Sequence, residues 1–114
     1  MIASKICLIV VESFNEHLEV IGRSNDSYDF FSRIANKLTW DIYIKLLNIE
    51  HGKNENSDQK VTLVELSKII EELENYYEKI GDDNFNSCFV YENLEDLKKI
   101  EEFLKSNINS MKNK

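Results

Sequence analysis

The chain has 114 residues, of which 42% are hydrophobic and 31% are charged, and its formal net charge at pH 7 is -7. This composition is typical of one soluble globular domain and excludes a disordered chain. The net charge argues against nucleic acid and anionic lipid as main partners, because a negative field repels phosphate groups.

The first predicted element is the apolar, β-branched run Ile6–Val11. Such a run predicts a strand that is covered on both faces. It is shorter than the core of a signal peptide and too short to span a bilayer, so we expect a cytoplasmic protein without membrane contact. His17–Ile21 alternates between apolar and polar residues and predicts a second strand, unless one long bent strand covers residues 4–21.

Two helices are expected next, after a polar loop at residues 22–27. In Tyr28–Leu38 the apolar residues recur on one helical face, which predicts a helix. Trp40–Glu50 fits a strand by its alternation and a helix by the spacing of its aliphatic residues. A cap at Thr39 and a stop at Gly52 favour the helix.

The segment Val61–Gly81 follows a polar loop at residues 54–60 and predicts a complete helix. Thr62 and Glu65 fit a capping box, and Gly81 fits the left-handed residue that ends a helix. One flank of this helix carries Ser67, Glu71, Glu74 and Glu78 at helical spacing, with no cation among them. Like charges at this spacing weaken an isolated helix by about 0.2–0.5 kcal/mol per pair.

The last elements are a strand at Cys88–Glu92, after a loop at residues 82–87, and a final helix that Asn93 caps. The predicted fold class is therefore α+β. We expect a small sheet, with strands near residues 5–12 and 88–92, packed against about four helices. Residues 1–114 are predicted to form a single domain in which residues 106–114 are a frayed tail.

The chain shows no convergent set of reactive groups. His17 and His51 do not stand at a metal-ligand spacing, and both are expected to face solvent. Each glycine is isolated, so no glycine-rich phosphate loop is present. Cys7 and Cys88 lie in apolar, strand-like runs and are expected to be buried free thiols. We therefore predict that the protein is not an enzyme and uses no cofactor and no metal.

The negative charge is concentrated in the second half of the chain: residues 63–104 contain twelve acids and four bases. Such a surface speeds the approach of a basic protein. The predicted partner-binding residues are Glu71, Glu74, Glu78, Asp82, Asp83, Glu92 and Glu95. Binding also needs aromatic or arginine anchors, for which the candidates are Arg33, Trp40, Tyr43 and Tyr91, provided that they are exposed.

The order of features resembles the immunity protein 70 group, bacterial immunity proteins that accompany secreted polymorphic toxins. The resemblance covers roughly residues 5–96. It is carried by the run Ile6–Val11, by DFFSRIANKL at Asp29–Leu38, by the segment from Trp40 to Gly52-Lys53, by LVELSKIIEELENY and by CFVYENLED.

This resemblance implies a non-catalytic immunity protein that binds and neutralises a cognate toxin domain, itself basic, inside the producing cell. The alternative is an acidic protein–protein interaction module without a toxin partner: an adaptor, a dimer subunit or a nucleic-acid-mimicking inhibitor. A homodimer is compatible with both hypotheses.

Overall fold

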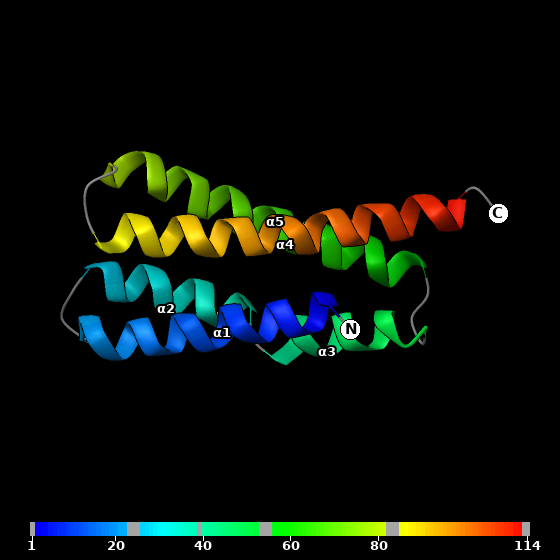
Figure 1. The fold of residues 1–114 in the computed structure, drawn as a ribbon, viewed down its shortest axis with the longest axis horizontal. Coiled ribbons are helices and arrows are strands. Elements are labelled where there is room, and N and C mark those ends of the chain that lie inside the picture. Colours follow the sequence, from blue (N-terminus) through cyan, green and yellow to red (C-terminus); the bar gives the residue numbers. More distant parts are fainter. Residues whose placement is uncertain (1, 23–25, 39, 53–55, 82–84, 113–114) are drawn as a thin grey trace.

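The computed structural model describes residues 2–22, 26–38, 40–52, 56–81 and 85–112. These residues form five α-helices and contain no strand (Figure 1). The fold class is therefore all-α, and the prediction of an α+β fold with a small sheet is wrong. The helices are α1 Ile2–Ile21, α2 Asp26–Leu38, α3 Trp40–Glu50, α4 Asn56–Ile80 and α5 Phe85–Lys112.

The helices form an elongated up-and-down bundle, with principal extents of 49 × 23 × 19 Å. Helices α2 and α3 run in the same direction along α1, as Figure 1 shows. Together they take the place of the second helix in a four-helix bundle. Helix α4 packs on α2, α3 and α5, and α5 returns to pack on α1. Short connections between antiparallel neighbours are the usual topology of such a bundle.

Helix α1 contains both segments that were predicted as strands, Ile6–Val11 and His17–Ile21. Its buried positions include Ala3, Cys7, Val10, Phe14 and His17, which recur at alternating spacings of four and three residues. That spacing puts one stripe along a helix. The stripe faces the bundle core. The run Ile6–Val11 alone suggests a strand, and the helical spacing of the buried residues is visible only over the whole segment from Ala3 to His17.

The predicted strand Cys88–Glu92 lies inside α5, and only Val90 of this segment is fully buried. Asn93 is not a cap, because its side-chain amide donates to the Phe89 carbonyl within the helix. Helix α5 then continues past Ile108, which is 6% exposed, to Lys112.

The predicted helices at residues 28–38 and 40–50 are confirmed, and so is the end of α4. Gly81 has a φ of +78° and follows the last residue of that helix. The predicted start is wrong: α4 begins at Asn56, within the predicted loop. Thr62 lies inside it, fully buried, with its hydroxyl donating to the Asp58 carbonyl.

A carboxylate from the end of α3 caps the beginning of α1. Glu50 accepts hydrogen bonds from the backbone N–H groups of Ala3, at 2.7 Å, and Ser4, at 3.3 Å, and from the Ser4 hydroxyl. Burial opposes ionisation of Glu50, but these hydrogen bonds outweigh it and hold its pKa below the ordinary value. An anion at a helix N-terminus is stabilising, so this contact ties α3 to α1.

Over the stretches that the structure describes, no helix is both long enough and apolar enough to cross a bilayer.

Candidate functional site

The candidate site is a hollow of about 180 Å³ between α4 and α5, which we call the acidic groove. Its lining residues are Glu74, Tyr77, Glu78, Tyr91, Leu94, Glu95 and Lys98. The two helices run antiparallel and pack against each other (Figure 1). Residues on one side of α4 therefore lie beside residues on one side of α5. Two carboxylates of α4, Glu74 and Glu78, thereby lie around one opening with Glu95 of α5.

Two tyrosines, together with Leu94, form the apolar part of the acidic groove. The rings of Tyr77 and Tyr91 lie 6.2 Å apart, centroid to centroid, and Tyr91 is 53% exposed. Hydrogen bonding to Glu95 and the charge of that carboxylate raise the pKa of the Tyr91 phenol. Tyrosine is favoured at interface anchors because it combines apolar area with a polar tip.

The negative charge of the acidic groove is only partly compensated. Lys98 approaches Glu74 at 3.8 Å, with both side chains about half exposed. Among the described residues, no ion pair reaches Glu78 or Glu95. Glu74 and Glu78 are also neighbours at i and i+4, where like charges repel. The groove is therefore a local negative site that a cation can relieve.

The structure brings together only some of the predicted partner-binding residues. Glu74, Glu78 and Glu95 line the groove, and Glu92 lines an adjoining hollow with Tyr77, Cys88 and Tyr91. Glu71 is exposed on α4, one turn before Glu74, but does not line either hollow. Asp82 and Asp83 lie outside the described residues.

Of the predicted anchors, only Tyr91 stands in this groove. Arg33 contacts Glu72 at 3.3 Å and lies over the Phe30 ring, on α2. Tyr43 is half-buried against the core. Trp40 begins α3, and its side chain lies outside the described residues. Tyr77 is not among the predicted anchors; its side chain is half-buried against the core and also lines the groove.

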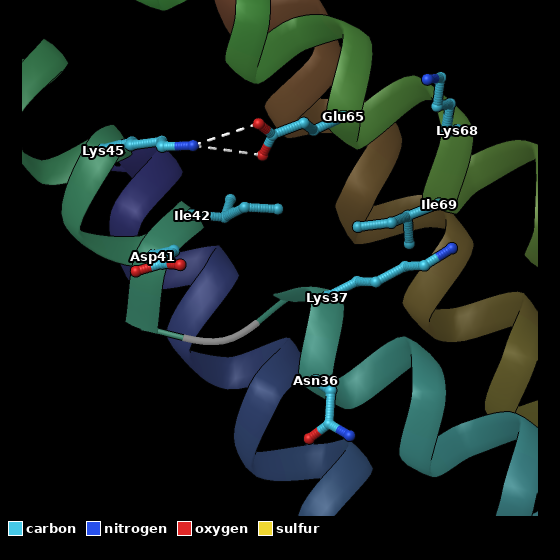
Figure 2. A pocket seen from close by; sticks show the side chains of 8 residues that line it. All are labelled: Asn36, Lys37, Asp41, Ile42, Lys45, Glu65, Lys68 and Ile69. Carbon is cyan, nitrogen blue, oxygen red and sulfur yellow. Dashed lines mark hydrogen bonds and ion pairs between the residues drawn. The ribbon is translucent and has the colours of Figure 1, made fainter.

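A second hollow, of about 370 Å³, lies between α2, α3 and α4, and we call it the charged cleft (Figure 2). Its lining residues are Asn36, Lys37, Asp41, Ile42, Lys45, Glu65, Lys68 and Ile69. The Lys45 ammonium contacts the two Glu65 oxygens at 3.2 and 3.4 Å, and Lys37 donates to Glu72 at 2.8 Å. Ile42 and Ile69 lie between these two cations in Figure 2 and are each 1% exposed.

Two of the three lysines of the charged cleft, Lys37 and Lys45, therefore link α2 and α3 to α4. Lys37 and Lys45 already have carboxylate partners, so they are poorly disposed to bind an anionic ligand. No motif in the sequence indicates this cleft, because its residues come from three helices.

His17 is buried near the end of α1, against the first turns of α5. It is 3% exposed, so the prediction that it faces solvent is wrong. Its ring stacks on Phe89 at 4.1 Å and meets Phe31 edge-on at 4.6 Å. Neither ring nitrogen has a hydrogen bond of good geometry among the described residues. Burial lowers its pKa, and the nearby Asn86 amide opposes this only in part.

The two cysteines are free, in different surroundings. Cys7 is fully buried in α1, and burial raises its pKa to about 12, which makes it a core residue and not a nucleophile. Cys88 is exposed, so the prediction of two buried thiols is half right.

Exposed acid is also present on α1, at Glu12, Glu16 and Glu19. The negative surface is thus wider than the predicted strip. What distinguishes the acidic groove from this row is the combination of several carboxylates with two tyrosines around one hollow.

Comparison of the chain with protein-family models, with curated proteins and with solved structures finds no match. The resemblance to the immunity protein 70 group stays a prediction.

Proposed function

We propose that this protein is a non-catalytic binding protein that captures a basic protein through the acidic groove between α4 and α5. The observation that carries the proposal is the convergence of Glu74, Glu78 and Glu95 beside an exposed Tyr91. The carboxylates steer a cationic surface towards the groove, and the tyrosines supply area that loses water on binding.

The groove suits capture of a side chain better than chemistry on a substrate. Lysine or arginine from a partner can reach Glu78 and Glu95, which have no cation of their own among the described residues. The stem of such a side chain can pack on Tyr91, and a guanidinium can also stack on its ring.

Neutralisation of a cognate basic toxin is the specific form of this function that the resemblance suggests. Toxin domains that act on RNA or DNA present a basic substrate-binding surface, and an acidic protein can occupy that surface. We include this role in the proposal because a toxin inhibitor needs preformed negative charge, which the groove carries and which speeds association with a basic surface.

The test uses the full chain as bait in an extract of its native cells, in parallel with the variant Glu74→Lys/Glu78→Lys. We expect the unaltered chain to retain a basic protein and the variant to lose it. With the purified partner, the variant should associate at least about tenfold more slowly, with a flatter dependence on salt.

A matched control is Glu12→Lys/Glu16→Lys on α1, which changes the net charge equally and also uses exposed positions at i and i+4. It should retain the partner. Equal loss of binding in both variants would show that only net charge matters, and an unchanged association rate in the α4 variant would remove the groove from the function.

A further inference from the structure

The outer face of the α4–α5 pair carries another hollow, of about 560 Å³, at the end away from the acidic groove. We call it the basic hollow; its lining residues are Lys60, Leu63, Val64, Lys105, Ile108 and Asn109. Three of its lining residues are aliphatic, and one of these, Val64, is 53% exposed. The chain thus leaves an aliphatic side chain open to water in a hollow that two lysines also line.

The basic hollow and the acidic groove belong to one continuous face. On α4, Lys60, Ser67 and Glu74 are seven residues apart, and Tyr91, Lys98 and Lys105 repeat that spacing on α5. Residues seven apart on a helix lie on nearly the same side. Between the two ends, Ser67 donates to Glu101 at 2.7 Å, which closes the middle of the face.

The charges on this face are opposite at its two ends. The acidic groove presents Glu74, Glu78 and Glu95, and the basic hollow presents Lys60 and Lys105. Lys105 contacts Glu101 at 3.6 Å with its side chain 57% exposed, so its ammonium is still open to solvent.

We infer that two copies of this chain associate through the α4–α5 face in a two-fold arrangement that lays the acidic groove of each copy over the basic hollow of the other. A two-fold interface needs a patch that is complementary to itself after a half-turn. A face with acid at one end and base at the other meets this condition, and the axis passes near its middle, close to Ser67 and Glu101.

The size of the face indicates a reversible dimer. From Lys60 to Glu78 the face is about 27 Å long, and two helices side by side are about 20 Å wide, which gives a footprint of about 540 Å². A stable interface of standard size covers about 800 Å² per partner. Half-exposed ion pairs contribute little each and are screened by salt. The dimer should therefore depend on both protein concentration and ionic strength.

This inference does not rest on the proposed function, although the two share the acidic groove. A second copy and a basic partner compete for Glu78 and Tyr91, so self-association lowers the apparent affinity for the partner. The exposed Val64 of the basic hollow is covered only in the dimer.

The experiment is sedimentation equilibrium of the full chain, alone and with two charge-reversed variants, Glu74→Lys/Glu78→Lys and Lys60→Glu/Lys105→Glu. We expect concentration-dependent dimerisation of the unaltered chain that weakens when the ionic strength rises from about 0.05 to about 0.5 M. Each variant alone should dimerise at least about tenfold more weakly, because like charges meet at both ends.

Mixing the two variants is the decisive arm, since a half-turn then pairs reversed acids with reversed bases. The mixture should form a dimer containing one copy of each variant, while Glu12→Lys/Glu16→Lys should dimerise as the unaltered chain does. A monomer at all concentrations overturns the inference, and so does a dimer that either variant leaves intact. Failure to capture a basic protein, with the dimer retained, would count against the proposed function alone.

Discussion

The charged cleft and the acidic groove use the same residue types in opposite ways. In the cleft, Lys37 and Lys45 of α2 and α3 each meet a carboxylate of α4, above two buried isoleucines. In the groove, three carboxylates of α4 and α5 lie beside an exposed tyrosine, and the lysine among the lining residues pairs with one of them, Glu74. Charges paired across helices contribute to the fold, whereas uncompensated charges cost the fold a little and remain open to a partner.

The largest expected difference is between the apolar side chains of the two regions. Ile69→Ala, at the base of the charged cleft, should lower the free energy of unfolding by about 2–5 kcal/mol, because it leaves a cavity in the core. Tyr91→Ala, in the groove, should cost only about 0.5 kcal/mol, because half of that side chain is already in water. Urea denaturation measures both. Equal losses would contradict the division of the molecule into a stabilising cleft and a binding groove.

Neutralising one carboxylate in each region should change the free energy of unfolding in opposite directions. Glu72 accepts from Lys37 at 2.8 Å and pairs with Arg33 at 3.3 Å, so Glu72→Gln should destabilise the chain, by about 0.5–1 kcal/mol because both cations are largely exposed. Glu78→Gln removes a repulsion with Glu74 and should stabilise it by about 0.2–0.5 kcal/mol. Both effects should shrink at high salt. Destabilisation by Glu78→Gln would mean that the groove carboxylate supports the fold.

Acid should also weaken the contact between α3 and α1 that the Glu50 carboxylate makes. The pKa of Glu50 is lowered in the folded chain, so its contribution is present above the unfolded value of about 4.3 and is lost as pH falls through the folded pKa. Glu50→Gln should cost about 1 kcal/mol at neutral pH, the typical value of a helix cap, and reduce the loss of stability in acid.

His17 acts in the same direction at higher pH, since burial lowers its pKa too. The pH dependence of stability is therefore compared with and without Glu50→Gln in a His17→Phe background, by thermal unfolding across the acid range. An acid slope of stability that Glu50→Gln leaves unchanged would contradict the capping role of this carboxylate.

The fold could be predicted where helical spacing extends over a whole segment, and it was mispredicted where a short apolar run dominated. Helices α2 and α3 and the end of α4 follow from spacing and from Gly81. In α1, the six residues of Ile6–Val11 suggest a strand, but the stripe from Ala3 to His17 matches a helix over its full length. Burial against three other helices overrides the β preference of such a run.

The α4 half of the acidic groove was predictable, because Glu74 and Glu78 need only the phase of one helix. On α5, the residues Tyr91 and Glu95 were assigned to a strand and to a different helix start, so their common face could not be seen. The charged cleft depends on how α2 and α3 meet α4, and no local pattern contains that information. The charged residues could be counted from the sequence, but the sequence could not show which of them form ion pairs between helices.

The smallest expected effect is a titration that reports on what occupies the groove. Hydrogen bonding to Glu95 and the charge of that residue raise the pKa of Tyr91 above its ordinary value of about 10. Glu95→Gln should bring this pKa down, as measured by the ultraviolet absorbance of the phenolate, with Tyr91→Phe identifying its share of the signal. A signal that Glu95→Gln leaves unchanged would contradict the contact.

The same titration can follow self-association at raised protein concentration. In the proposed dimer, Lys60 and Lys105 of a second copy lie over Tyr91, and nearby cations favour the phenolate. The pKa of Tyr91 should therefore fall as the dimer forms, and the fall should be absent in Lys60→Glu/Lys105→Glu. If no second copy covers the groove, the pKa of Tyr91 should be the same at every protein concentration. That result would contradict the proposed dimer.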